Sequence, residues 1–429
     1  MILQEIESSP RERLEALQLE RLRDTVGRVL AGQRSIRRRL ASAGLQAAGD
    51  IGSLDDLRSL PFTEKHDLRD AYPFGLLAVP REQLVRIHAS SGTGGKPTVV
   101  GYTAGDLEVW TEVMARSLAM AGVRAGMVLH NAYGYGLFTG GLGIHQGAER
   151  LGATVVPISG GMTERQAMLL RDLRGQVLCC TPSYALNIAQ ALRDAGITGD
   201  ELALEIGFFG AEPWTDVMRA QIEHELGLTA LNVYGLSEIV GPGVAAECPE
   251  GRDGSHIHED HFLVEVIDPG SGRPMAEGEE GELVFTTLTK EAMPLLRYRT
   301  GDIASVSTER CACGRTTARM SAIRGRHDDM LIIRGVNLYP SEIERVLLGV
   351  DGVAPHWQLL VDRPAALDEL TVLCEPVTDG IDQESLAERI IHALREATGV
   401  GMAVQLMVPG EVPRSQGKAV RVIDRRPAR

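Results

Sequence analysis

The chain has 429 residues, more than one hydrophobic core usually supports, so we predict at least two domains. Its net charge of -14 argues against general nucleic-acid binding, and 44% hydrophobic with 24% charged residues is typical of a globular protein. No apolar run approaches a membrane span, and the N-terminal segment lacks a signal-peptide core, so we expect no membrane association and a cytoplasmic location.

The first part of the chain is predicted to be helical at residues 11–50 and to form a β-hairpin at 84–103. The hairpin loop is rich in backbone N–H, hydroxyl and ammonium groups that bind anions. These groups belong to Ser90, Ser91, Gly92, Thr93, Gly94, Gly95 and Lys96. We predict a phosphate loop here, although its spacing is not that of a Walker A motif and a hairpin without a ligand is the alternative.

Strands and helices alternate from about 104 to 236, which predicts right-handed crossovers and a mainly parallel sheet with a site at the strand ends. We place a β-rich subdomain at about 240–325, where short alternating strands are separated by turns. After a charged loop, residues 326–429 read as a separate α+β unit. The expected fold is therefore α/β, with an N-terminal domain at 1–325 and a small C-terminal domain at 326–429.

The cysteines are too few and too unevenly spaced for a disulfide scaffold. Three of them, Cys179, Cys180 and Cys374, lie in apolar runs and are predicted to be core residues. The other three lie in loops near histidines, and three thiolates with one imidazole form a suitable set for structural Zn²⁺. The predicted ligands are Cys248, His256, Cys311 and Cys313, with His258 as the alternative histidine and reduced cysteines without a metal as the alternative state.

Seven motifs, taken together and in this order, resemble the adenylate-forming acid:CoA ligases over nearly the whole chain, most of all those that activate aryl acids. They are SSGTGGKP (90–97), YGYGLFTGG (133–141), FGAEPWT (209–215), YGLSE (234–238), LRYRTGD (296–302), GRHDDMLIIRGVNLYPSEIE (325–344) and RSQGKAVRV (414–422). One departure is Gly94, where the loop of the family usually has a second threonine. That departure puts one hydroxyl contact to phosphate in doubt.

The resemblance implies an enzyme that uses ATP, Mg²⁺ and coenzyme A and that has a mobile C-terminal lid domain. In the catalytic set, Lys418 would bridge the substrate carboxylate and the phosphate, Glu238 would hold Mg²⁺, and Arg326 would join the ribose site. The loop residues Ser90, Ser91, Gly92, Thr93, Gly94 and Lys96 would bind the outer phosphates. The other implied nucleotide-site residues are Gly210, Ala211, Glu212 and Pro213 beside the adenine and acyl group, Tyr234 over the base, Gly235, Ser237, Asp302 at the ribose hydroxyls, and Asp328 at the hinge.

An apolar slot with aromatic walls would suit an uncharged aryl acid. Its predicted lining is Tyr133, Tyr135, Phe138, Gly241 and Pro242. Aromatic residues make up 4% of the chain, so three of them within six residues is an enrichment, although core packing alone would also explain it. Phenylacetate is the first choice, and substituted benzoates or phenylacetates stay open.

Two alternative functions also stay open. The chain could adenylate an aryl acid and pass it to the thiol of a carrier protein, because no residue pattern separates that acceptor from coenzyme A. It could instead bind a nucleotide or acyl-adenylate without turnover, although the presence of Lys418 and Glu238 argues against this. A homodimer stays open as the assembly.

Overall fold

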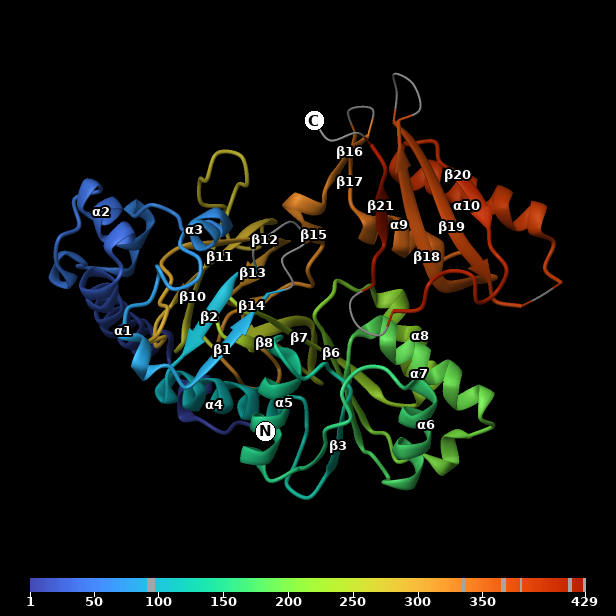
Figure 1. The fold of residues 1–429 in the computed structure, drawn as a ribbon, viewed down its shortest axis with the longest axis horizontal. Helices are drawn as coiled ribbons and strands as arrows, with labels where there is room; N and C mark the ends of the chain where they lie inside the picture. Colours follow the sequence, from blue (N-terminus) through green and yellow to red (C-terminus); the bar gives the residue numbers. More distant parts are fainter. Residues whose placement is uncertain (91–96, 334–335, 364–367, 379, 416–418, 427–429) are drawn as a thin grey trace.

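The computed structural model of the chain describes residues 1–90, 97–333, 336–363, 368–378, 380–415 and 419–426. Figure 1 shows a large N-terminal part built around a central sheet and a smaller C-terminal part, from β16 onward, that lies next to α7 and α8. Within the described residues, no helix is both long enough and apolar enough to span a membrane.

The central sheet runs in the order β13-β14-β9-β8-β7-β6-β5-β3-β4. Its strands from β4 to β7 are parallel, whereas β8, β9, β14 and β13 are antiparallel to their neighbours. The bounds are β3 Val128–Asn131, β4 Thr154–Val156, β5 Val177–Cys180, β6 Ile206–Gly210, β7 Thr229–Leu236, β8 Gly241–Cys248, β9 Gly251–Ile257, β13 Val306–Ser307 and β14 Arg319–Met320. Strands β5 and β6 are buried along their whole length, which explains their continuous apolar sequences.

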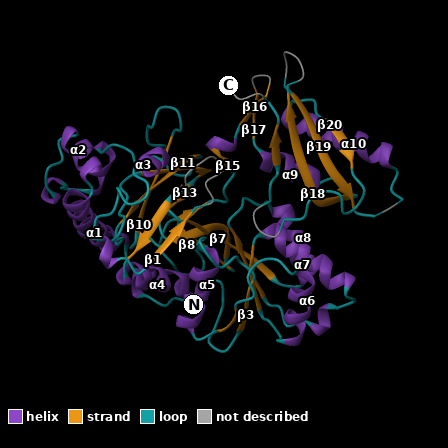
Figure 2. Cartoon of the chain, in the orientation of Figure 1, coloured by secondary structure: helices purple, strands orange, loops and turns teal. Residues whose placement is uncertain are grey.

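The helices of the N-terminal part lie before the strands of this sheet in the chain or, from residue 104 onward, alternate with them as predicted. They are α1 Arg11–Gly32, α2 Arg34–Ser42, α3 Lys65–Asp70, α4 Ala104–Met120, α5 Gly140–Leu151, α6 Thr163–Asp172, α7 Pro182–Asp194 and α8 Asp216–Leu226. Figure 2 shows α6, α7 and α8 in a row, with the C-terminal part beside α8. One buried cluster packs beneath these three helices, while a larger cluster joins α1, α4 and α5 to the sheets.

Two further sheets belong to the N-terminal part. The predicted hairpin is formed by β1 (Arg86–Ala89) and β2 (Val99–Tyr102), which pair in antiparallel register. A second antiparallel sheet runs in the order β10-β11-β12-β15. Its bounds are β10 Phe262–Ile267, β11 Gly281–Thr287, β12 Tyr298–Ala304 and β15 Gly325–Arg326. This separate sheet begins at Phe262 rather than near 240, because β8 and β9 hydrogen-bond into the central sheet.

The C-terminal part has its own core, made by side chains from its strands and from both of its described helices. Its mixed sheet runs in the order β20-β19-β18-β21, and β16 pairs with β17 as a short hairpin. The bounds are β16 Leu331–Ile333, β17 Val336–Leu338, α9 Pro340–Leu348, β18 Val353–Asp362, β19 Glu369–Pro376, α10 Gln383–Thr398, β20 Ala403–Leu406 and β21 Val422–Asp424. A separate core allows this part to move as a unit.

Candidate active site

Asp302, Arg326 and Tyr234, three residues predicted for the nucleotide site, meet at one carboxylate. Asp302 on β12 stands opposite Arg326 on β15 in the strand register. The Arg326 guanidinium donates to Asp302 Oδ1 at 2.9 Å, and the Tyr234 hydroxyl donates to Oδ2 at 2.6 Å. Because these donors hold a carboxylate that is only 8% exposed, its orientation is set before any ligand binds.

Tyr234 lies in the central sheet, and its ring stacks on Phe285 with centroids 6.0 Å apart. Burial, followed by the negative charge of Asp302, raises the pKa of Tyr234 well above its ordinary value, so the phenol keeps its proton and acts as a donor. Two glycines predicted for the nucleotide site, Gly210 and Gly235, lie so close to neighbouring backbone that no side chain would fit. A Cβ at Gly210 would lie 2.1 Å from the Val233 carbonyl oxygen, and one at Gly235 would lie 2.0 Å from that of Gly241.

Glu238 lies in the turn between β7 and β8, and its residue is 8% exposed. The Tyr102 hydroxyl braces this turn by donating to the carbonyl oxygens of Val240 at 3.1 Å and Ser237 at 3.4 Å. Burial is the main cause that raises the pKa of Tyr102, and the nearby charges of Asp106 and Glu238 add to it. Glu238, the predicted Mg²⁺ ligand, therefore lies in a turn that Tyr102 of β2 holds in place.

Two residues of the predicted aryl slot, Tyr133 and Gly241, are buried in the structure. Tyr133 is buried, and a Cβ at Gly241 would collide with Trp110 and Thr139, so this glycine lies in a tightly packed place. Pro242 is held through its carbonyl oxygen, which accepts a hydrogen bond of 2.9 Å from Trp110 Nε1.

The other two predicted slot residues behave differently. Tyr135 is half-buried, and its hydroxyl accepts from Asn131 at 2.7 Å and lies 3.1 Å from His145 Nδ1. Phe138 is 53% exposed, so it does not line a buried slot in this arrangement. The preceding residue, Leu137, is held through its carbonyl oxygen, which accepts a hydrogen bond of 3.0 Å from the Ala89 N–H at the end of β1.

The phosphate loop begins at the end of β1. Ser90 N–H donates to the Thr98 carbonyl oxygen at 3.0 Å and so closes the base of the loop. The Ser90 hydroxyl is buried and has no hydrogen-bond partner within the described part of the chain. The other predicted phosphate ligands lie outside the described residues; they are Ser91, Gly92, Thr93, Gly94 and Lys96.

Glu212 follows Ala211, whose φ of 70° turns the chain sharply after β6. Its Oε1 accepts hydrogen bonds from the Ser183 N–H at 2.7 Å and from the Ser183 hydroxyl, while Oε2 accepts one from Ala419 N–H at 2.9 Å. Pro213 continues this loop and is exposed. The carboxylate expected near the adenine and acyl group thus joins α7 to the C-terminal part.

Lys418 lies outside the described residues, but both ends of its segment are held against the N-terminal part. Asn187 Nδ2 on α7 donates to the Ser415 carbonyl oxygen at 2.6 Å, and Ala419 N–H donates to Glu212. The predicted hinge residue Asp328 lies in a short 3-10 helix, His327–Asp329, between the two parts. Its side chain is outside the description.

The four predicted metal ligands converge beside the β8–β9 hairpin of the central sheet. The candidate ligand atoms of Cys248, His256, Cys311 and Cys313 lie within 4.8 Å of one another. His256 Nε2 is 3.4 Å from Cys313 Sγ and 3.7 Å from Cys248 Sγ, while Cys248 and Cys311 sulfurs are 3.7 Å apart. The alternative, His258, instead lies 2.9 Å from the Ser117 hydroxyl. Four such donors around one point match the donor set of a tetrahedral site.

Two local features suit this cluster to a metal. Burial favours the neutral thiol, yet hydrogen bonds from His256 and Arg315 outweigh it and lower the pKa of Cys313 to about 5. The orienting partner of His256 is Thr317, whose hydroxyl lies 3.2 Å from Nδ1 and leaves Nε2 facing the sulfurs. A Cβ at Gly251 would approach Cys311 Sγ to 2.6 Å, so glycine is required beside the cluster.

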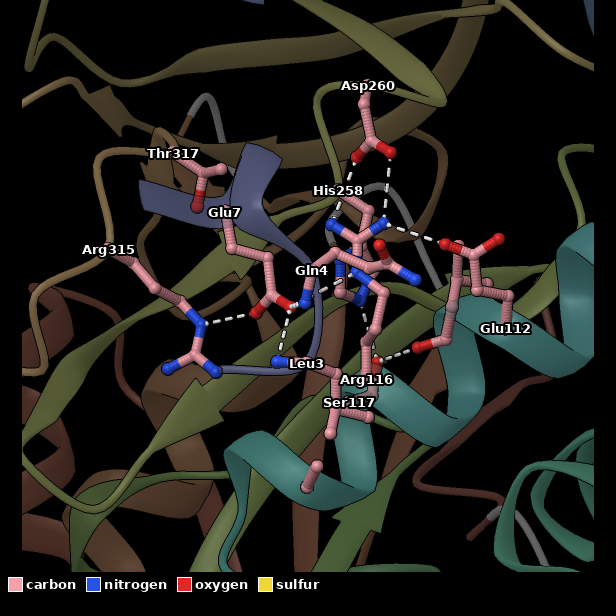
Figure 3. A network of polar contacts seen from close by, with 12 residues as sticks. Leu3, Gln4, Glu7, Glu112, Arg116, Ser117, His258, Asp260, Arg315 and Thr317 are labelled. Atoms are coloured by element: carbon pink, nitrogen blue, oxygen red, sulfur yellow. Dashed lines mark hydrogen bonds and ion pairs between the residues drawn. The ribbon is translucent and has the colours of Figure 1, made fainter. Parts of the chain in front are cut away.

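Figure 3 shows a buried polar network that links this metal loop to the N-terminal segment. Arg315 donates through Nε to Glu7 Oε2 at 2.8 Å and through Nη1 to Cys313 Sγ at 3.5 Å. Arg116 pairs in bidentate fashion with Asp260 at 2.9 and 3.1 Å. Sequence reasoning missed this network, since its members are spread over more than 300 positions and each reads as a surface charge.

The comparisons with known proteins agree with this geometry. The sequence profile of the AMP-binding enzyme matches residues 29–288, and that of the AMP-binding enzyme C-terminal domain matches residues 335–426. The chain belongs to the AMP-binding enzyme family. The family resemblance seen in the seven motifs and the expected fold class are therefore confirmed.

Among members of this family, the chain is 56% identical to a phenylacetate-coenzyme A ligase of Thermus thermophilus over 98% of this chain and 99% of that protein. It is 49% identical to a phenylacetate-coenzyme A ligase of Escherichia coli, covering 99% of this chain and 98% of the relative. These alignments span nearly the whole chain, so the likeness includes both its N-terminal and its C-terminal part.

A solved 2-hydroxyisobutyryl-CoA ligase resembles the structure closely when it is in its postadenylation state. That structure has a TM-score of 0.91 at 29% identity, covering 97% of this chain and 91% of the other. The same ligase in its thioesterification state has a TM-score of 0.73 with similar coverage. Since the two scores concern one ligase, this AMP-binding enzyme has its domains arranged more like the postadenylation state.

Sequence reasoning missed the partners that hold the predicted residues in place. Ser183 and Asn187 lie four residues apart on α7, where Ser183 holds Glu212 and Asn187 contacts the C-terminal part, while Tyr102 braces the Glu238 turn. The spacing of four between Ser183 and Asn187 in the helical segment SYALN only weakly indicates that these two residues share one face. No local pattern distinguishes Tyr102 from a core tyrosine.

Proposed function

We propose that the chain joins an aryl carboxylic acid to coenzyme A in an ATP-dependent reaction that passes through an acyl-adenylate and releases AMP and pyrophosphate. The observation that carries this proposal is the 56% identity to a phenylacetate-coenzyme A ligase over nearly the full length of both proteins. Phenylacetate is the first substrate, because the relatives named for it match so completely and because Tyr133 and Tyr135 are aromatic residues of the proposed slot.

The chemistry asks for two displacements. A substrate carboxylate oxygen attacks the α-phosphorus of ATP, and the bond to the bridging oxygen of pyrophosphate breaks. The thiol sulfur of coenzyme A then attacks the acyl carbon. The bond between that carbon and the phosphate oxygen of AMP breaks, and AMP leaves. In the first step the negative carboxylate approaches the negative phosphates of ATP, so a fixed positive charge beside them lowers the barrier. We assign that charge to Lys418, whose segment is bounded by contacts with Glu212 and Asn187.

The remaining roles follow from the contacts. Asp302 would accept hydrogen bonds from the ribose hydroxyls, with Arg326 and Tyr234 holding it in place. Glu238 would hold Mg²⁺, which when bound neutralises charge on the phosphates. The hairpin loop after Ser90 would supply donors to the outer phosphates.

The test is acid-dependent pyrophosphate release over a panel of aryl and aliphatic acids, with and without coenzyme A. We expect the highest kcat/KM with phenylacetate and expect mass spectrometry to find phenylacetyl-CoA and AMP. Pyrophosphate release without thioester formation would point to a carrier-protein acceptor instead. No release with any acid would contradict the proposed reaction and favour a nucleotide-binding protein.

We also propose that Cys248, His256, Cys311 and Cys313 hold one structural Zn²⁺. Three sulfurs and one imidazole nitrogen within 4.8 Å of one another support it, as does the lowered pKa of Cys313, because thiolates are the zinc-binding form. The ligands come from β8, β9 and the loop before β14, so a metal there would join segments that are distant in sequence. Within the described part of the chain, the contacts of these side chains are with one another, Thr317 and Arg315, so the proposed role is structural.

Zinc removal should therefore lower stability. We expect protein purified without a histidine tag to contain about one zinc per chain by elemental analysis, and Cys311→Ser to lose it. The variant should also unfold at a Tm lower by roughly 5 °C, because the bound metal stabilises only the folded chain.

Controls separate the metal from ordinary core damage. His256→Ala should lose the metal, whereas His258→Ala should keep it, because only His256 faces the sulfurs. Cys374→Ala, at a buried cysteine in the C-terminal core, should retain zinc although it too can lower the Tm. Zinc-free wild-type protein with full stability would end this proposal.

A further inference from the structure

Lys290 lies in the loop after β11 and is buried, which is rare for a lysine. It is 5% exposed, and within the described part of the chain its ammonium has no hydrogen-bond partner. Only four of the 44 lysine and arginine residues are lysines, and two of the others, Lys96 and Lys418, are predicted to bind anionic groups of the substrates. Because a buried ammonium of this kind costs folding free energy, its presence indicates a role other than stability.

The ammonium of Lys290 lies on the ring of Tyr102. Its Nζ is 3.7 Å from the centroid of that ring, within the range of a cation–π interaction. The Tyr102 hydroxyl donates to the carbonyl oxygens of Val240 at 3.1 Å and Ser237 at 3.4 Å, on either side of Glu238. We propose that Lys290 is a positioning residue, which through Tyr102 holds the Glu238 turn for the Mg²⁺–ATP complex. The inference rests on the proposed function, because it takes Glu238 as the ligand of Mg²⁺.

The backbone that follows Lys290 is fixed on the first turn of α4. The Asp106 carboxylate accepts hydrogen bonds from the N–H groups of Glu291 at 2.6 Å and Ala292 at 3.0 Å. The Thr103 hydroxyl, at the N-cap of α4, donates to the Glu291 carboxylate at 2.6 Å. Since α4 begins directly after β2, these contacts tie the Lys290 segment to the strand that carries the tyrosine.

Tyr102 belongs to a buried aromatic group that contacts the Glu238 turn more than once. Its ring stacks on Trp110 with centroids 5.2 Å apart, and His88 meets both rings edge-on. Trp110 Nε1 donates to the Pro242 carbonyl oxygen at 2.9 Å. Two side chains of the group thus hold carbonyl oxygens of residues 237–242, so a change on the tyrosine ring should reach this segment directly.

Lys290→Met tests the proposal, because methionine keeps the length of the side chain and removes its charge. We expect the KM for Mg²⁺–ATP to rise about 10-fold, the loss typical of a desolvated cation–π contact, while the KM for the acid changes by less than about 2-fold. The Tm should not fall, because the variant no longer buries an ammonium. An unchanged KM for Mg²⁺–ATP would overturn the proposal, whatever the Tm.

Tyr102→Phe removes the hydroxyl and keeps the ring, so it should raise the same KM by about 5-fold. If Lys290 acts through Tyr102, the double variant should bind Mg²⁺–ATP about as well as Lys290→Met does, because both changes break one chain of contacts. Fold-changes that multiply would contradict this route. Lys65→Met is the matched control, because Lys65 is only partly buried and lies on α3, outside the aromatic group.

The pH dependence tests the charge itself. Burial outweighs the nearby charge of Asp106 and lowers the pKa of Lys290 to about 8. The other titratable groups against it stay neutral above about pH 7, because burial raises the pKa of Tyr102 and lowers that of His88. The ammonium is therefore lost as the pH rises through about 8. The KM of the wild type for Mg²⁺–ATP should then rise toward that of Lys290→Met, and a parallel rise in both proteins would contradict a role for this charge.

Hydrogen–deuterium exchange without ligands gives a readout that does not depend on activity. In Lys290→Met and in Tyr102→Phe, the peptide covering 236–243 should lose protection, while the peptide covering β6 in the same sheet keeps it. Unchanged protection of 236–243 would refute the hold on the Glu238 turn. If the wild-type protein releases no pyrophosphate with any acid, the proposed function fails, and the deuterium result still decides whether Lys290 holds this turn.

Discussion

Lys418→Ala should slow acyl-adenylate formation by on the order of 10²-fold or more, as expected when a positioned charge at a developing anion is removed. Thioester formation from pre-made acyl-adenylate should persist, because we expect the C-terminal part to have moved by then and the lysine to have no further task. The two rates are measured separately, as pyrophosphate release and as thioester yield.

The structure supplies the control for this substitution. Val420 lies two residues further along, its side chain is 68% exposed, and Val420→Ala should leave both rates unchanged. Since Ser415 and Ala419 are held through main-chain atoms, their contacts with Asn187 and Glu212 should survive in Lys418→Ala. Equal loss of both half-reactions would refute the assignment of Lys418 to the first step.

Asp302→Ala should raise the KM for ATP by about 10²-fold, because it removes the carboxylate proposed to accept from two ribose hydroxyls, each bond to a charged group contributing about 1.5–3 kcal/mol. The KM for the acid should change far less. Steady-state kinetics with each substrate varied in turn checks this, and an unchanged KM for ATP would place the ribose elsewhere.

Tyr234→Phe tests the same proposed ribose site without removing the negative charge of Asp302. It deletes the donor that lies 2.6 Å from Asp302 Oδ2 and leaves the Arg326 contact at 2.9 Å. We expect a smaller rise in the KM for ATP, about 5-fold, from the loss of one hydrogen bond to a carboxylate. A larger effect than that of Asp302→Ala would mean that the tyrosine, not the aspartate, contacts the nucleotide.

Much of the fold and of the candidate site was predictable from local sequence. The alternation of apolar strands and amphipathic helices predicted the parallel part of the central sheet, because strand and helix periods are properties of neighbouring residues. The motif order identified the family, and with it Asp302, Arg326 and Tyr234, which meet in space although 92 positions separate the outer two. The Cys-x-Cys turn predicted two metal ligands, and Cys248 and His256, which are distant in sequence, were predicted to complete the set.

Only the tertiary structure decided how distant strands pair and which distant residues contact each other. Strands β8 and β9 joined the central sheet rather than the β-rich subdomain, since an antiparallel strand can pair with any exposed edge and periodicity does not name the partner. The sequence favoured His256 over His258 as the fourth candidate ligand, and only the strand register, which sets His256 against Arg319, places its side chain beside the cysteine loop. Glu212 looked like a pocket residue in sequence, but its contact with Ala419 depends on how two separately folded domains dock, and such long-range contacts leave no local pattern.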